Sequence, residues 1–568
     1  MPKTAHCRLT KKPFEITDLE LDFFKRMDLP LPDLCFKERM RQLMAFRNEW
    51  KLYPRKCDST GKNILSAYSA DSPFTIYSNE IWWGDSWDAT QYSRDFDFSK
   101  PFFDQFAALQ RVVPREGTSV FNSENCEYNG HIRQSKNCYL NSLIAQCEDV
   151  YYSYWTVKDK DIMDSLCTNE STLCYECHEV NNGYECIFLE ESKDCNHCYF
   201  GFQLRGCDHC IFCANLANQS YCIANKPCTK EEFETLKNKI LCGSWKEWEK
   251  AKNHYQFIKS KTPHRYAHTL NCEHCTGDHL YHSKNCENCY DGFNSEDVTH
   301  SVSFADGKDL HSIYSAGWPR CELIYNSVVS RGCQNLAFCY YSWFCNNLRY
   351  CDSCVSCENC LGCIGLRHKK YCIFNKQYTQ TEYEKISKKI IDHMKKFGEW
   401  GCYFPPELSP FAYNETGAQD YFPLPKEKAL ELGYRWREED RREFKPSTLP
   451  ALPDNIKDVK DDIVKEILAC EICKKNYRLI PQELRFYRKE NLPFPHECPE
   501  CRHRRRFQSR NPYELFKRTC NKCNAEIKST YAPSRPEIVY CEKCYLKEMG
   551  SFFPHKQALN QVFLDQIW

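Results

Sequence analysis

The sequence lacks several features that would point to a common function. Lysine plus arginine equals aspartate plus glutamate at 77 each, so the chain has no net charge and should not bind nucleic acid over its whole surface, although a local patch stays open. No run of 18 apolar residues exists, so no membrane span and no membrane partner are expected. Only 20 glycines occur. We find no Gly-rich phosphate loop, His-Glu-x-x-His pair or nucleophile elbow, which favours a non-enzymatic protein.

The start of the chain also lacks the apolar core of a secretory signal, so a cytoplasmic protein is expected. The 41 cysteines should then stay reduced. Cys-x-x-Cys spacing in such a chain indicates metal binding or packing rather than disulfides.

Four Cys-x-x-Cys pairs lie in 75 residues near the C-terminus. Each pair can form a tight knuckle, and two knuckles complete a tetrahedral all-sulfur site with no open position. We therefore expect two structural Zn²⁺ ions, in preference to chance pairs of buried thiols or an iron centre. The predicted ligands are Cys470, Cys473, Cys498 and Cys501 for one ion, and Cys520, Cys523, Cys541 and Cys544 for the other.

Residues 7–81 align without a gap with the C-terminal segment when it is shifted back by 463 positions. Cys7, Cys35 and Cys57 remain, but the second cysteine of each of these knuckles is lost. We interpret residues 1–85 as a copy of the module that kept its fold and lost its metals. A weaker mixed site of Cys7, Cys35 and Glu38 is the alternative.

Motifs of the C-terminal segment resemble those of a known family. Cys470-x-x-Cys473, a Glu-Leu-x-Phe-Tyr helix and Cys498-Pro-x-Cys501-Arg are similar to the bacterial probable zinc-ribbon, or treble-clef, domain, and residues 518–546 resemble its partner ribbon. The whole layout, including the segment from Asp95 and the linker from Pro405, resembles uncharacterised bacterial Cys-rich zinc-ribbon proteins. The resemblance implies zinc binding and no established activity.

A twelve-residue period runs through the middle of the chain. One column of positions begins at Cys126 and includes Val150 and Cys222, and a second begins at Cys286 and includes Ile324, after a slip of two residues, and Cys372. A short fixed period predicts stacked units. We expect a mostly β, multi-domain protein with two parallel β-solenoid stacks, whose coil takes twelve or twenty-four residues. Capping helices should follow Thr229-x-x-Glu232 and Thr379-x-x-Glu382.

These patterns predict a chain organisation in eight parts. They are a metal-free double ribbon (1–85), a connector (86–119), the first solenoid half (120–225), a helical cap and linker (226–268), the second half (269–375), a capping helix (376–402), a Pro-rich linker (403–468) and the zinc-binding double ribbon (469–568).

The solenoid cysteines exchange with valine, isoleucine and leucine within one column, which indicates core packing rather than ligation. One run is denser and offers an alternative metal site: Cys351, Cys354, Cys357, Cys360 and Cys363. Two polar columns, Asn137/Asp149/Asp161 and Asn285/Asp297/Asp309, indicate turn caps; a cation site or a carbohydrate-active solenoid enzyme is the alternative.

A basic run accompanies the cysteines of the C-terminal ribbons. Arginine pairs with phosphate and aromatic side chains stack on bases, so the run predicts RNA or DNA binding, a solvated face being the plainer explanation. The predicted contacts are Arg502, Arg504, Arg505, Arg506, Arg510, Lys517 and Arg518. The solenoid would serve as a spacer or protein-docking surface, and metal handling is a further alternative.

Overall fold

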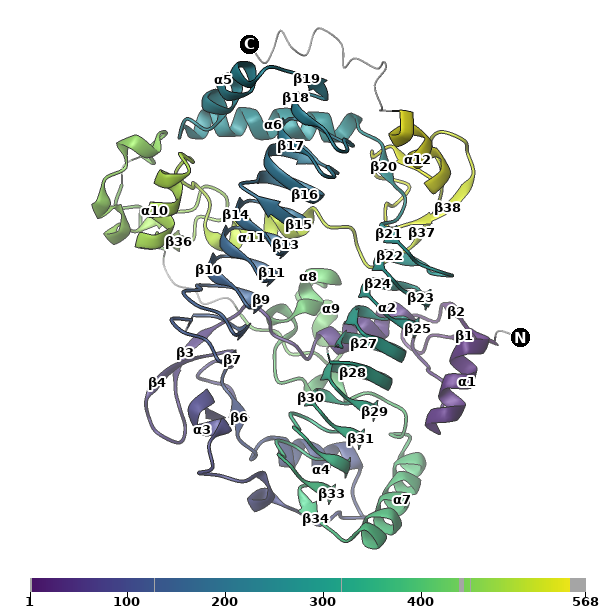
Figure 1. Cartoon of the computed structure of the whole chain (residues 1–568). Coiled ribbons are helices and arrows are strands. Elements are labelled where there is room, and N and C mark those ends of the chain that lie inside the picture. The colour runs from purple at the N-terminus through teal and green to yellow at the C-terminus, as the bar shows by residue number, and fades with distance from the viewer. Residues whose placement is uncertain (1–2, 127, 318, 439–443, 450, 552–568) are drawn as a thin grey trace.

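The computed structural model describes residues 3–126, 128–317, 319–438, 444–449 and 451–551. More of it is strand (33%) than helix (25%), so the predicted mostly β class is confirmed. Two large sheets of mainly parallel strands form the centre, and the two ends of the chain fold against them (Figure 1).

The first sheet holds 13 strands. From β7 to β18 paired strands run parallel, and each residue pairs with the one 12 positions later, as in Val150 with Ile162 and Cys198 with Cys210. The offset is therefore 12 residues rather than 24. The strands are β7 (Ser119–Phe121), β8 (His131–Arg133), β9 (Ser142–Ala145), β10 (Glu148–Tyr151), β11 (Tyr154–Val157), β12 (Lys160–Met163), β13 (Leu166–Asn169), β14 (Thr172–Tyr175), β15 (His178–Tyr184), β16 (Ile187–Phe202), β17 (Asp208–Ile211), β18 (Ser220–Ile223) and β19 (Lys226–Pro227).

The second sheet holds 14 strands and repeats this register. Leu310 pairs with Ile324, which is the expected slip of two residues. The strands are β21 (Thr269–Leu270), β22 (Gly277–Tyr281), β23 (Lys284–Glu287), β24 (Cys289–Phe293), β25 (Glu296–Thr299), β26 (Val302–Ala305), β27 (Gly307–Ala316), β28 (Cys321–Arg331), β29 (Gln334–Ala337), β30 (Tyr340–Trp343), β31 (Asn346–Arg349), β32 (Glu358–Leu361), β33 (Lys370–Ile373) and β34 (Lys376–Gln377).

The backbone of both sheets bends at a short, regular interval. A residue with φ near +50° recurs at every third position over long stretches, for example Asn137, Leu140, Leu143 and Gln146. Four such segments separate a residue from its partner in the next strand. Asparagine, aspartate and glycine tolerate this left-handed conformation best, which explains their frequency at these bends. The first-column cysteines are buried between the bends, among apolar side chains.

Helices close the far end of each sheet, as predicted. Thr229 and Glu232 form a capping box at the start of α5 (Lys230–Ile240), and Thr379 and Glu382 form one at the start of α7 (Gln380–Phe397). Helix α6 (Trp245–Lys261) packs along β16. Helix α5 contacts β17 and β18, and α7 contacts β33, close to the end of each sheet.

The two end segments are built from the same elements in the same order. Shifted by 463 positions, most helix and strand starts of the N-terminal module fall on those of the C-terminal module. The N-terminal elements are β1 (Lys3–His6), β2 (Pro13–Ile16), α1 (Asp18–Met27), α2 (Phe36–Met44), β3 (Tyr53–Lys56), β4 (Asn63–Ser66), β5 (Ile76–Tyr77) and α3 (Asn79–Trp83). The C-terminal ones are β35 (Leu468–Ala469), β36 (Asn476–Tyr477), α10 (Pro481–Lys489), α11 (Pro499–Gln508), β37 (Phe516–Thr519), β38 (Glu526–Ser529), β39 (Val539–Tyr540) and α12 (Glu542–Ser551).

The first half of each module lies against a different sheet (Figure 1), and the second half reaches the other sheet, where Asn79 donates to Val120 and Thr530 donates to Asp278. Helix α2 packs on β27 and β28 of the second sheet, whereas α10 and α11 lie beside the first sheet. Smaller elements complete the fold: β6 (Arg115–Glu116) pairs with β5, β20 (His264–Arg265) pairs with β39, and α4 (Phe102–Gln110), α8 (Gly417–Tyr421) and α9 (Lys426–Glu431) pack in the connecting segments.

None of the helices that the structure describes is both long and apolar enough to cross a membrane.

Candidate metal centres

The first four-cysteine group joins two short turns of the C-terminal module. Cys470 follows β35, and the turn closes where its carbonyl accepts from the Lys474 amide at 3.0 Å. Cys498 is the N-cap of α11 and Cys501 lies in the first turn of that helix. The Cys473 and Cys498 sulfurs lie 3.7 Å apart, and the ligand atoms of all four cysteines lie within 4.8 Å of one another.

The second group repeats this arrangement. The Cys520 carbonyl accepts from the Asn524 amide at 2.9 Å, and the Cys541 amide donates to the Cys520 sulfur at 3.3 Å. Cys523 and Cys541 place their sulfurs 3.8 Å apart, and Cys544 completes a group within the same 4.8 Å limit.

These sulfur separations fit a bound metal ion. Four thiolates at about 2.3 Å from a tetrahedral ion stand about 3.8 Å from one another. A disulfide would need about 2.05 Å between its sulfurs, and all of these cysteines are free. Two groups of four cysteines that can each hold a metal ion are therefore present, at the predicted residues.

Backbone amides around the first cysteine of each group favour the thiolate. Although burial opposes the shift, amide hydrogen bonds lower the pKa of Cys470 and lower that of Cys520 to about 6. The thiolate is the form that binds a metal, so these positions are prepared for ligation.

The N-terminal module keeps the turns without the ligands. The Cys7 carbonyl accepts from the Lys11 amide at 2.8 Å, as Cys470 accepts from Lys474 in the other module. The alternative mixed site of Cys7, Cys35 and Glu38 is not among the groups close enough to share an ion in the described residues. The Glu38 carboxylate is instead ion-paired with Arg41.

The cysteine run at 351–363 is not brought together as a ligand group within the part of the chain that the structure describes. All five residues are buried, and their thiols face backbone carbonyls, as Cys354 faces Cys363 at 3.6 Å.

Both polar columns occupy left-handed bends. Every member, from Asn137 to Asp161 and from Asn285 to Asp309, has φ between 51° and 56°. Asn285 donates to Asp297 at 2.9 Å, and Arg26 of the N-terminal module donates to Asp309 at 2.6 Å. The backbone conformation and these partners account for the columns as turn positions.

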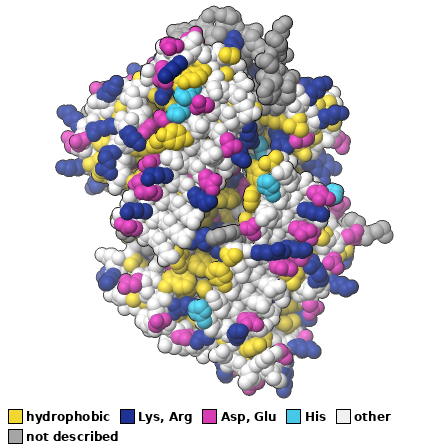
Figure 2. Space-filling model, in the orientation of Figure 1, with side chains coloured by type: hydrophobic (Ala, Val, Ile, Leu, Met, Phe, Trp, Pro, Cys, Tyr) yellow, Lys and Arg dark blue, Asp and Glu magenta, His cyan; other side chains and the backbone are white. Residues whose placement is uncertain are grey.

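The predicted nucleic-acid contacts do not form one exposed face in the structure. Arg502 and Arg506 are buried, Arg505 and Arg510 are mostly covered, Arg518 is half-buried, and Arg504 and Lys517 are exposed. The cause is the docking of α11 on the first sheet, which the linear sequence does not show. Over the two sheets, basic and acidic side chains are interspersed on the face in Figure 2.

The arginines of α11 lie close to acids of the first sheet, and Arg502 also donates to Glu483 of α10 at 2.9 Å. Arg502 and Arg506 lie 3.4 and 3.0 Å from the fully buried Asp164, and Arg505 lies 2.8 Å from Glu176. Although burial opposes it, Arg505 and Arg506 lower the pKa of Glu176 to about 2. We call Arg502, Arg505, Arg506, Asp164 and Glu176 the arginine clamp.

Sequence reasoning missed the acidic half of this clamp. Asp164 and Glu176 stand 12 positions apart, directly after Met163 and Tyr175, which have the same spacing. The signal in the sequence was two acidic residues at twelve-residue spacing in the repeat, together with a run of arginines near the C-terminus.

No known protein family matches the chain, and a search among curated proteins found no relative. The resemblance to zinc-ribbon proteins therefore rests on the cysteine motifs and on the geometry of the two groups.

Proposed function

We propose that this protein is a zinc-dependent, non-enzymatic scaffold of the cytoplasm. Its two β-solenoid arms, near residues 120–225 and 269–375, would present long rigid surfaces to a protein partner. The two four-cysteine groups would hold structural Zn²⁺ and keep the C-terminal module folded as a double zinc ribbon.

One observation carries the proposal: the metal ligands and the arginine clamp share one helix. Cys498 caps α11, Cys501 lies in its first turn, and Arg502 follows directly. An ion that fixes the start of α11 thereby fixes the direction of the arginines that reach Asp164 and Glu176. Zinc would in this way control the attachment of the C-terminal module to the first arm.

The acidic partners make this attachment specific. Asp164 is fully buried, and the two arginines around it are 3% and 4% exposed at their side chains. A buried carboxylate that loses its cations strongly destabilises the folded protein. The C-terminal module should therefore dock on the first solenoid arm in one defined position.

RNA or DNA is a second candidate partner, supported by the exposure of Arg504 and Lys517. If nucleic acid binds there, the double variant Arg504→Ala/Lys517→Ala should lose most of the affinity for a short RNA and show a weaker dependence on salt. Unchanged affinity and salt dependence would remove this candidate.

Metal analysis and unfolding test the scaffold proposal together. Full-length protein purified with zinc should hold an ion in each four-cysteine group, and a strong chelator should remove both and release α11 from the first sheet. Replacement of zinc by cobalt should give intense sulfur-to-metal charge-transfer absorption. Protein that is fully folded without metal would contradict the proposal.

A further inference from the structure

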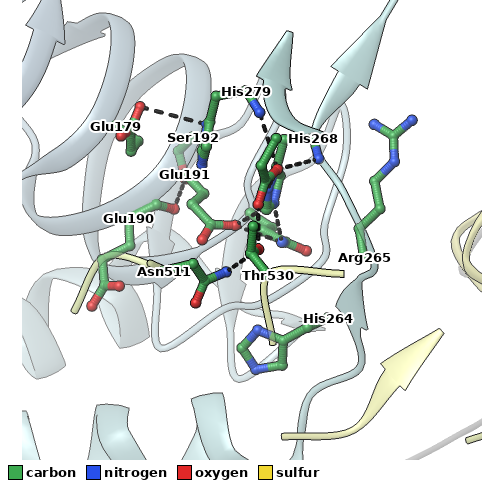
Figure 3. Close-up of polar contacts among 12 residues, drawn as sticks. Glu179, Glu190, Glu191, Ser192, His264, Arg265, His268, His279, Asn511 and Thr530 are labelled. Carbon is green, nitrogen blue, oxygen red and sulfur yellow. Dashed lines mark hydrogen bonds and ion pairs between the residues drawn. The ribbon is translucent and has the colours of Figure 1, made fainter. Parts of the chain in front are cut away.

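A small cavity lies where the two sheets and the C-terminal module meet. His178 and Glu179 enter it from the start of β15, His279 from β22 and Asp291 from β24. The segment after α11, from Ser509 to Tyr513, closes it. Figure 3 shows Glu179 and His279 pointing toward one another from the two sheets.

The polar side chains around the cavity belong to two facing columns. On the first sheet Glu179, Glu191 and Gln203 follow one another at 12-residue spacing. On the second sheet His268 and His279 stack with ring centres 4.7 Å apart. The columns face each other across the junction between the sheets (Figure 3).

At one level of the two columns, the histidine nitrogens already have partners within the protein. His268 lies 2.8 Å from Glu191 through Nε2 and 3.0 Å from Asp278 through Nδ1. Both ring nitrogens of His268 therefore have a carboxylate partner.

At the neighbouring level of the columns, buried polar atoms lack hydrogen bonds. Nε2 of His178, Oε1 of Glu179 and Nδ1 of His279 are all buried and make no hydrogen bond within the described residues. Glu179 lies 3.7 Å from His178 Nε2 and 3.8 Å from His279 Nδ1, beyond hydrogen-bonding distance. Glu179 Oε1 is still ion-paired with Arg510 at 3.3 Å, but the two imidazole nitrogens have no such partner. Buried polar atoms without partners cost roughly 1–3 kcal/mol each, so two of them at one cavity indicate a ligand.

The hydrogen bonds of Ser509 fix the tautomer of His178. The Ser509 hydroxyl donates its proton to the Arg506 carbonyl at 2.6 Å. Its oxygen must then accept the Nδ1 proton of His178, 3.0 Å away. In the neutral ring this leaves the lone pair on Nε2, and a histidine whose other ring nitrogen is already hydrogen-bonded is the usual arrangement around a metal. The His178 side chain is only 7% exposed.

The donor atoms suit a divalent cation. Glu179, His279 and Asp291 each offer an atom within 4.8 Å of the others. Arg510 lies 2.8 Å from Asp291 and 3.3 Å from Glu179, and it offsets one of these two carboxylate charges. Imidazole nitrogen combined with carboxylate oxygen favours ions of the zinc or manganese type.

We propose that Glu179, His279 and Asp291 form a third metal site, with His178 supplying a second nitrogen beside Glu179. The site would take a divalent transition-metal cation and would tie the two sheets to each other. It is separate from the four-cysteine groups, because none of its donors is a thiolate.

Zinc counting on the full chain tests this site. Wild-type protein loaded with Zn²⁺ and desalted should hold three ions, and the near-isosteric variants His279→Gln and Glu179→Gln should hold two. The control His274→Gln changes a histidine between β21 and β22 whose side chain is 77% exposed, and it should keep three ions. Two ions in the wild type, or three in either variant, would overturn the proposal.

Cobalt separates this test from the test of the four-cysteine groups. Sulfur-to-cobalt charge transfer reports only the thiolate sites, so it should be identical in wild type, His279→Gln and Glu179→Gln. If cobalt-loaded wild type shows no such absorption, the four-cysteine proposal is rejected. The third site is then judged by the difference in ion count between wild type and the two variants. A variant that fails to fold leaves the wild-type count as the deciding number.

Discussion

The hydroxyl of Tyr152, in the first sheet, donates a 2.9 Å hydrogen bond to the Glu483 carboxylate of the C-terminal module. The same contact recurs at the other end of the chain. Glu20 stands 463 positions before Glu483, His300 stands 148 positions after Tyr152, and these two residues lie 3.4 Å apart. The first helix of each module therefore contacts a sheet in a related way, through a carboxylate that reaches it.

Removing the hydrogen bond between Tyr152 and Glu483 should weaken the docking of the C-terminal module on the first sheet. Tyr152→Phe leaves an oxygen of the buried Glu483 without its donor, which should cost about 1–3 kcal/mol of stability. Denaturant unfolding measures the change. Tyr139→Phe is the control, because Tyr139 precedes β10 in the same sheet and is only partly buried; an equal loss in both variants would contradict a specific role for Tyr152.

Breaking the arginine clamp should have a larger effect. Arg506→Ala leaves the fully buried Asp164 with one cation fewer, and the expected loss is about 3–5 kcal/mol. Arg504→Ala on the same helix removes a side chain that is 55% exposed and should change stability by less than about 0.5 kcal/mol. Thermal unfolding compares the two, and similar melting temperatures would argue against the clamp.

The column cysteines should behave as core residues. Cys360 pairs with Leu348 in the preceding strand and is fully buried. Cys360→Val should therefore cost less than about 1.5 kcal/mol and leave the metal content unchanged. Cys501→Ser, which removes a predicted ligand, should lower the metal count by one. Metal loss in Cys360→Val would show that the run at 351–363 binds an ion after all.

Asp159 should make stability depend on pH. It is 1% exposed, and burial raises its pKa to about 7, against the hydrogen bonds from Thr168 and Ser171. In the unfolded chain the carboxyl ionises near pH 3.9. The folded state therefore holds the proton more tightly, and stability should fall as pH rises from about 4 to about 7, then stay level.

The Asp159→Asn variant checks this dependence, because the amide imitates the protonated acid. Its free energy of unfolding should lack this fall between pH 4 and pH 7, so it should exceed the wild-type value most at pH 7 and above. The full effect of such a shift is on the order of 4 kcal/mol. Parallel pH profiles of the two proteins would show that Asp159 does not titrate in this range.

Features that depend on residues close together in the sequence could be predicted, and features that depend on distant residues could not. The register of Val150 with Ile162 and the capping box at Thr229 follow from local spacing, and both were predictable. The cysteine groups were predictable for the same reason. The burial of Arg502 was not, because it depends on Asp164, more than 300 positions away, and a basic run has the same local appearance on a solvated face and in a buried clamp.

The third site shows the same limit. Glu179 and Glu191 are visible as one column and His268 and His279 as another, but only the folded chain shows that the columns face each other. The left-handed bends were also beyond the sequence, because leucine and tyrosine occupy them as well as asparagine.

Hydrogen–deuterium exchange with and without zinc tests the central claim most directly, because the N-terminal module, which has no four-cysteine group in its described residues, is an internal control. If zinc holds the C-terminal module on the first sheet, chelation should increase exchange in α10, α11 and β13–β15. It should leave α1, α2 and β27–β28 unchanged. An equal increase in α2 and β27–β28, or no increase in α11, would contradict the account.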